Sequence, residues 1–151
     1  MAKITFKIPQ KIQKLLFTLV GTSWFTGILF FVLKTWFIVE GEFGPEKHPW
    51  QFPTLMIHAA SAFLIMILYG ALLITHVPSS WKLNRMRVLG ISLITVVAFQ
   101  IISAYLLYYL ANEQIRDIVE YLHLGAGFTL PFILTAHIII GVKSGKRYKK
   151  E

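Results

Sequence analysis

Four long apolar stretches dominate the pattern of hydrophobic and polar positions along the chain. They cover residues 15–39, 53–76, 88–111 and 119–142, about 24 residues each. A helix of about 20 apolar residues is long enough to cross a hydrocarbon core of about 30 Å. The pattern predicts an all-α fold, an integral membrane four-helix bundle in which residues 1–151 form a single four-span transmembrane domain.

The composition supports this prediction. Hydrophobic residues make up 56% of the 151 residues, and the mean hydropathy is +0.63. A soluble protein of this size could not bury so much apolar surface. Short connections also leave little of the chain for an extramembrane domain.

The formal charge of +8 alternates between the two ends of the predicted spans. The connecting segments at residues 40–52 and 112–118 lie at one end of the spans and carry most of the acidic residues. The opposite face, which includes both termini, carries most of the cations: Lys3, Lys7, Lys11, Lys14, Lys82, Arg85, Arg87, Lys143, Lys146, Arg147, Lys149 and Lys150. This is the positive-inside pattern, which predicts that both termini are cytoplasmic. The basic clusters suit anionic headgroups, so no nucleic-acid partner is needed, and we expect a bacterial inner membrane location.

The absence of cysteine limits the chemistry that the chain can carry. It excludes disulfides, iron–sulfur clusters held by thiolates and the covalent attachment of c-type haem. Any haem in this protein would be of the b type, held by ligation and packing.

Four histidines lie inside the second and fourth spans. His58 and His76 are eighteen residues apart, and His123 and His137 are fourteen apart. At helical rise these spacings are about 27 Å and about 21 Å, and each pair falls on one face of its helix. The charge pattern makes both helices run in the same direction, which pairs His58 with His123 near the outer surface. The inner pair, His76 and His137, is then displaced by about 6 Å.

Haem ligation is the interpretation that best explains these histidines. Ionisable residues inside a membrane are costly and usually serve a function. Neither cysteine nor carboxylate completes a tetrahedral zinc set at either level. The structural alternative is isolated histidines that hydrogen-bond to Ser, Thr or Gln of a neighbouring helix. Tilt, a kink at Pro131 or loosening before Pro78 would absorb the inner displacement; without them, only the outer site is matched.

The chain resembles small four-helix di-haem b-type cytochromes. This group includes the membrane subunits of respiratory dehydrogenases and hydrogenases and the haem-bearing half of bc-complex cytochrome b. The thirteen residues between His123 and His137 match the last of these, whereas the seventeen between His58 and His76 do not. Unlike the dehydrogenase subunits, the first span has no histidine. The resemblance implies electron transfer between a quinone pool and a partner redox protein.

The predicted function is therefore membrane electron transfer through two b haems, with a quinone as a further expected ligand. Expected cationic partners of the haem propionates are Lys34, Lys47, Arg116, Arg85 and Arg87. One alternative is a non-redox accessory or scaffold subunit of a larger membrane complex. A proton or metal-ion transporter is less well supported because the spans lack acidic residues between their ends.

Other polar or small residues in and near the spans have simpler interpretations. We expect His48 to be an exposed loop histidine and Gly27 to serve helix packing. Gln100 and Ser103, three residues apart, should lie on one helix face and hydrogen-bond to a neighbouring helix.

Overall fold

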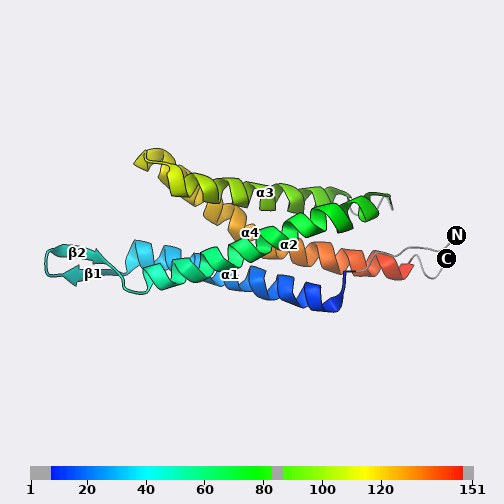
Figure 1. Cartoon of the computed structure of the whole chain (residues 1–151), viewed down its shortest axis with the longest axis horizontal. Helices are drawn as coiled ribbons and strands as arrows, with labels where there is room; N and C mark the ends of the chain where they lie inside the picture. The colour runs from blue at the N-terminus through cyan, green and yellow to red at the C-terminus, as the bar shows by residue number, and fades with distance from the viewer. Residues whose placement is uncertain (1–7, 83–86, 148–151) are drawn as a thin grey trace. The chain divides into compact units, whose positions relative to one another are not determined.

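The computed structural model describes residues 8–82 and 87–147, which form four α-helices and one β-hairpin (Figure 1). The elements are α1 (Gln10–Trp36), β1 (Ile38–Gly41), β2 (Gly44–Lys47), α2 (Gln51–Lys82), α3 (Arg87–Tyr109) and α4 (Glu113–Arg147). Each helix contains a segment long and apolar enough to cross a membrane. The prediction of four helices of membrane-spanning length is confirmed.

Two compact units divide the chain, and the boundary between them falls inside α2. The N-terminal unit, Pro9–Leu68, contains α1, the hairpin and the first half of α2. The C-terminal unit contains α2 from Tyr69 onward, α3 and α4. The single transmembrane domain stays a prediction.

In the N-terminal unit, α1 and the first half of α2 are antiparallel and are joined by the hairpin. The Gln51 side chain, at the start of α2, donates a 3.1 Å hydrogen bond from Nε2 to the Leu33 carbonyl near the end of α1. The sequence pattern extended the first span to residue 39, but α1 ends at Trp36 and the next residues enter β1. Ile38 and Val39 are β-branched and favour a strand once the glycines and proline that follow prevent further helix.

The hairpin itself was not predicted. Its strands are four residues each, paired antiparallel with Ile38 opposite Lys47 and Gly41 opposite Gly44. Gly44 has a φ of 119°, a conformation that favours glycine, and it allows the tight turn to close. The hairpin was missed because its turn residues are Glu and Phe, whereas a tight hairpin turn usually contains an Asn-Gly pair.

His48 closes the N-terminus of α2. Its carbonyl accepts a 2.9 Å hydrogen bond from the Gln51 N–H, and its Nδ1 accepts one of 3.2 Å from the Trp50 N–H. The side chain is half-buried rather than exposed, and its ring meets that of Phe37 edge-on. His48 is therefore a loop histidine with a local role in starting α2.

In the C-terminal unit, α3 and α4 form an antiparallel helical hairpin. Asn112 caps α4: its side-chain oxygen accepts a 3.0 Å bond from the Ile115 N–H, and its carbonyl accepts one of 2.9 Å from the Arg116 N–H. Tyr69 joins α2 to α3 through a 3.0 Å hydrogen bond from its hydroxyl to the Ile94 carbonyl. Because the connection between α3 and α4 is short, the capped start of α4 sets the register of this helix pair.

Pro78 and Pro131 are accommodated inside continuous helices. Pro78 lies within α2, which continues to Lys82, and Pro131 lies within α4. The suggested loosening of the helix before Pro78 is not seen. The Thr135 hydroxyl donates a 2.7 Å bond to the Pro131 carbonyl, which ties the turn after the proline together.

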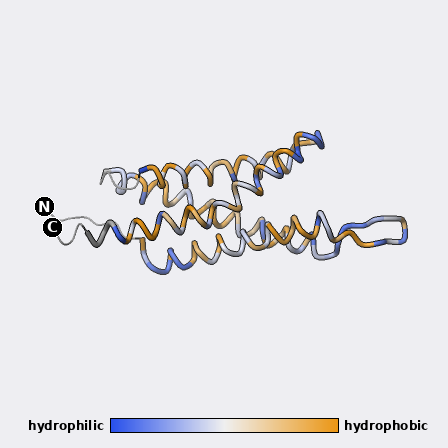
Figure 2. The backbone as a smooth tube through the Cα atoms, turned by 180° about the vertical axis from the view of Figure 1, so that it is seen from behind, coloured by the Kyte–Doolittle hydropathy of each residue, from blue (hydrophilic) through white to orange (hydrophobic). Residues whose placement is uncertain are grey.

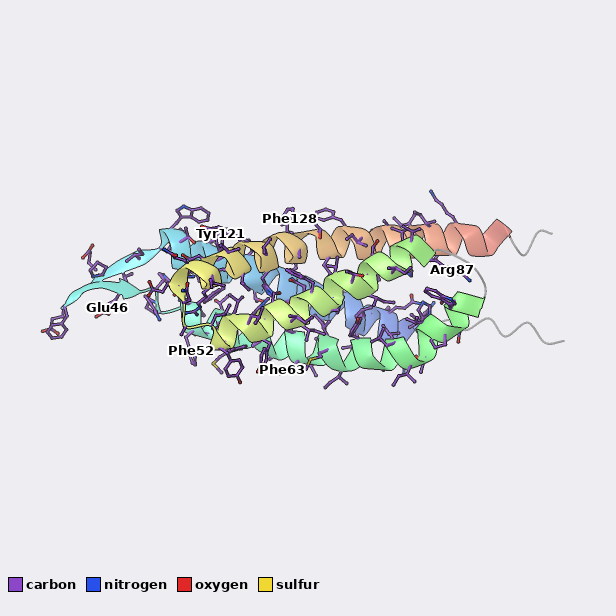
Figure 3. The ribbon with its side chains drawn as sticks, turned by 90° about the horizontal axis from the view of Figure 1, so that it is seen from above. Glu46, Phe52, Phe63, Arg87, Tyr121 and Phe128 are labelled. Carbon is purple, nitrogen blue, oxygen red and sulfur yellow. The ribbon has the colours of Figure 1, made fainter. Side chains whose placement is uncertain are left out.

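Burial is inverted relative to a soluble protein. Among the described residues, the buried side chains are mostly polar, whereas large apolar side chains lie on the surface. Phe63 and Phe128 point away from their helices (Figure 3) and are 60% and 50% exposed. Hydrophobic residues run along the helices, with hydrophilic ones more frequent at their ends (Figure 2). Small and polar contacts between helices with apolar outer faces are typical of membrane helices.

Tyr69→Phe tests the hydrogen bond that ties α2 to α3. We expect a loss of about 0.5–1.5 kcal/mol in the free energy of unfolding, because the hydrogen bond from the Tyr69 hydroxyl is lost while the Ile94 carbonyl stays within α3. Detergent–SDS titration with helical content as the signal measures the change. Tyr108→Phe, a largely exposed position on α3, is the control and should leave stability unchanged.

Candidate histidine sites

His76, on the second half of α2, and His137, on α4, both lie in the C-terminal unit, near enough for charge on one imidazole to affect the other. In both, Nδ1 is buried and has no hydrogen-bond partner among residues 8–82 and 87–147. The Nε2 of His76 lies 3.3 Å from the Ser80 hydroxyl, one turn further along α2. The pairing of His76 with His137 at one cofactor stays a prediction.

Gly90 of α3 lies beside this pair. A Cβ at this position would lie 3.9 Å from Cε1 of His137, an ordinary contact distance. A small side chain at this position would therefore touch the imidazole of His137 without displacing it. The sequence analysis did not identify Gly90, since only the register of α3 against α4 shows which residue faces His137.

His58 occupies a notch on α1 in the N-terminal unit. Its Nδ1 lies 2.9 Å from the Ser23 carbonyl oxygen and 3.4 Å from the Ser23 hydroxyl. A Cβ at Gly27 would lie 2.9 Å from Cε1 of His58, too close for any other residue without displacement. Because a carbonyl oxygen only accepts, Nδ1 carries the proton and the lone pair belongs to Nε2. Gly27 serves helix packing as predicted, and the group packed against it is an imidazole.

His123 is held by Ser103 of α3. Its Nδ1 lies 2.7 Å from the Ser103 hydroxyl oxygen, which in turn lies 2.7 Å from the Phe99 carbonyl oxygen. The hydroxyl has one proton, which it donates to the carbonyl, so it accepts the Nδ1 proton of His123. Ser103 is only 2% exposed. The predicted hydrogen bond between Ser103 and a neighbouring helix is confirmed.

Gln100 faces α4 one turn away from Ser103. Its amide nitrogen lies so close to Gly127 that a side chain there would collide with it, and its amide oxygen is buried without a partner in the described parts of the chain. Gln100 and Ser103 therefore do share a face, as their spacing predicted. Gly127, like Gly27 and Gly90, marks a place where a polar side chain meets the neighbouring helix.

His58 and His123 belong to different units, so their predicted pairing stays a prediction. Each separately has the arrangement that metal-ligating histidines usually have, in which one ring nitrogen donates to a backbone or hydroxyl oxygen. Residues 8–82 and 87–147 contain no group of three or more His, Asp or Glu side chains placed to hold a metal ion. Two imidazoles suit haem iron, whose other four ligands belong to the porphyrin, better than tetrahedral zinc.

The predicted cationic residues occupy the ends of the helices. Lys34 is exposed in the last turn of α1, Arg116 is exposed near the start of α4, and Lys47 is exposed at the end of β2. Arg85 lies outside the described residues.

Arg87 begins α3, one turn before Gly90 and thus at the His137 end of the C-terminal unit. Its guanidinium lies 5.1 Å from the centre of the Trp81 ring and donates a 3.3 Å bond to the Trp81 carbonyl.

Comparisons with protein-family models, with curated proteins and with solved structures find no match for this chain. Its function must therefore be argued from the sites themselves.

Ser103→Ala tests the anchoring of His123. The buried Nδ1–H would lose its acceptor, which we expect to lower the free energy of unfolding by about 1–3 kcal/mol. Ser92→Ala is the matched control, because Ser92 is also on α3 and bonds only to the carbonyl of Val88 one turn earlier. Equal losses for the two variants in SDS titration would contradict the assigned role of Ser103.

Gly27→Val tests the notch that receives His58. The added side chain must displace the imidazole, so we expect a loss of about 1–3 kcal/mol in unfolding free energy, as for overpacked cores. Gly21→Val is the control on the same helix, since a Cβ at Gly21 meets no atom within 4 Å. If Gly21→Val destabilises the protein as much, the effect is one of helix propensity and not of the notch.

Proposed function

We propose that this protein is a membrane-embedded b-type cytochrome that transfers electrons through two bis-histidine haems, between a quinone pool and a partner redox protein. The observation that carries the proposal is the His76–His137 pair. The two histidines lie on helices of membrane-spanning length, near enough for charge on one imidazole to affect the other, and both Nδ1 atoms are buried without a partner in the described residues. Buried polar atoms of this kind are rare unless a ligand completes them.

The remaining histidines support the same proposal. The Nδ1 protons of His58 and His123 are committed to Ser23 and Ser103, which assigns the lone pair of each ring to Nε2. A neutral imidazole with this tautomer is the form that ligates haem iron. The proposal pairs His58 with His123 at the outer haem and His76 with His137 at the inner haem. With no cysteine in the chain, both haems would be of the b type.

Charge supports an orientation for this arrangement. Arg87 and the basic segments near both termini would face the cytoplasm under the positive-inside pattern, together with the His76–His137 pair. His58 and His123 would then lie toward the outer surface of a bacterial inner membrane. Arg87 is the best-placed candidate to offset a propionate charge of the inner haem, and Lys34 and Arg116 are the corresponding outer candidates.

The residues of the chain have distinct tasks in this mechanism. Bound haem supplies a one-electron iron couple. Ser23 and Ser103 hold the imidazoles of His58 and His123 in one tautomer and one orientation, which keeps the ligand field constant through a redox cycle. Helices of membrane-spanning length would keep the haems in a low dielectric, which raises the influence of nearby charges on the potential. A stronger hydrogen bond from the Nδ1–H of His58 or His123 to its serine acceptor would make the imidazole a stronger donor to iron and so lower the potential of that site.

Haem content tests the proposal. We expect the protein purified from haem-replete cells to contain two haems per chain, with a low-spin b-type reduced-minus-oxidised spectrum. His76→Leu and His137→Leu should each lose one haem and leave the spectrum of the other. His58→Leu and His123→Leu should each remove the complementary haem.

His48→Leu is the control, since His48 lies in the loop before α2 and bonds to the backbone of Trp50. It should keep both haems. Wild-type protein without haem, together with normal behaviour of all four span variants, would overturn the proposal in favour of a non-redox scaffold subunit. A wild-type protein with a single haem per chain, which survives both inner substitutions, would remove the inner site alone.

A further inference from the structure

The β-hairpin is a solvent-exposed platform with an aromatic residue at its tip. It extends beyond the end of α1 (Figure 1), and its turn residues are Glu42 and Phe43. Phe43 is 94% exposed, more than any other large hydrophobic side chain in the described residues. A phenyl ring held out on a closed two-strand turn is available for contact with another molecule.

The strands keep this ring in a defined place. Four residue pairs from Ile38–Lys47 to Gly41–Gly44 hold the hairpin, and Gly44 supplies the positive φ of the turn. The Glu46 side chain lies over Gly41, where any Cβ would collide with it. Glu46, which Figure 3 shows on the hairpin, lies opposite Val39 and on the same face of the sheet.

The charge around Phe43 is negative in a chain that is strongly positive overall. The hairpin carries three carboxylates, Glu40, Glu42 and Glu46, against the single ammonium of Lys47. All four side chains are exposed. An excess of exposed charges of one sign creates a field that steers and orients a partner of opposite sign.

From this juxtaposition we infer that the hairpin is a docking surface for a cationic soluble protein, with Phe43 as its central contact and Glu40, Glu42 and Glu46 around it. An exposed aromatic ring surrounded by charges resembles the anchor and rim of a protein interface. The outward position of the hairpin rests on the orientation given under the proposed function. The docking surface does not depend on the presence of haem.

Other occupants fit the hairpin less well. A second copy of the chain would bring the same negative charges together. An anionic membrane surface would repel all three carboxylates, although the phenyl ring alone would suit the headgroup region. Only a basic partner would contact the phenyl ring and also balance the charge of the three carboxylates.

A binding assay with the intact protein in nanodiscs of zwitterionic lipid tests the inference. The probe is a lysine-rich soluble cytochrome, and the same cytochrome with its lysines acetylated is the control probe. We expect saturable binding of the first that weakens with rising salt, and no binding of the second. Phe43→Ser should weaken binding about tenfold, as the loss of an anchor residue does.

Charge reversal provides a matched comparison. The double variant Glu42→Lys/Glu46→Lys should weaken binding at least about tenfold and reduce its salt dependence. Glu113→Lys/Asp117→Lys makes the same change of charge at the start of α4 and should have a much smaller effect. Equal weakening by both double variants would overturn the inference, because it would mean that only the net charge matters.

A second measurement separates the protein partner from lipid. The chain has no native cysteine, so Phe43→Cys can be labelled with a nitroxide at one site. We expect the label to collide with a water-soluble relaxant and to be protected when the probe binds. Collision with oxygen in the lipid instead would overturn the inference in favour of membrane insertion. Haem content is measured on every variant, so a failure of the proposed cytochrome function is visible separately.

Discussion

One physical constraint connects the features of this chain: in helices long and apolar enough to cross a membrane, a polar group needs a partner within the protein or a ligand. The four span histidines meet this constraint in two ways. His58 and His123 each meet an oxygen on the neighbouring helix, while the Nδ1 atoms of His76 and His137 are buried without a partner in the described residues. The apolar side chains, which would form the core of a soluble protein, are left to face outward. The helices are thus organised around polar contacts.

Glycine makes these contacts sterically feasible. Gly27 faces the imidazole of His58, Gly90 faces that of His137, and Gly127 faces the amide of Gln100. A side chain at Gly27 or Gly127 would force its neighbour to move. Each of these glycines lowers the intrinsic stability of the helix that contains it. Membrane-spanning helices in general contain glycine more often than soluble helices do. The polar residues and the facing glycines therefore form one set, and the proposed cofactor sites are built on that set.

Much of the fold could be predicted from local patterns. The four apolar stretches gave the helices, because span length and hydropathy are properties of a segment by itself. Gln100 and Ser103 were expected on one face for the same local reason. The hairpin was missed, since its four-residue strands and Glu-Phe turn carry little local signal, and α1 consequently ended three residues earlier than expected. The cap of α4, which the Asn112 side-chain oxygen makes, was likewise seen only in the structure.

The sequence by itself determined which residues carry the chemistry: four histidines at helical spacing, no cysteine, and charge segregated to the ends of the spans. Which atoms meet was decided only by the tertiary structure. It made Ser23 and Ser103 the partners of His58 and His123, and it left the Nδ1 atoms of His76 and His137 buried without a partner in the described residues. The physical reason is that a helix face is fixed by the 3.6-residue period, whereas the register between two helices is fixed by packing, capping and the loops that join them.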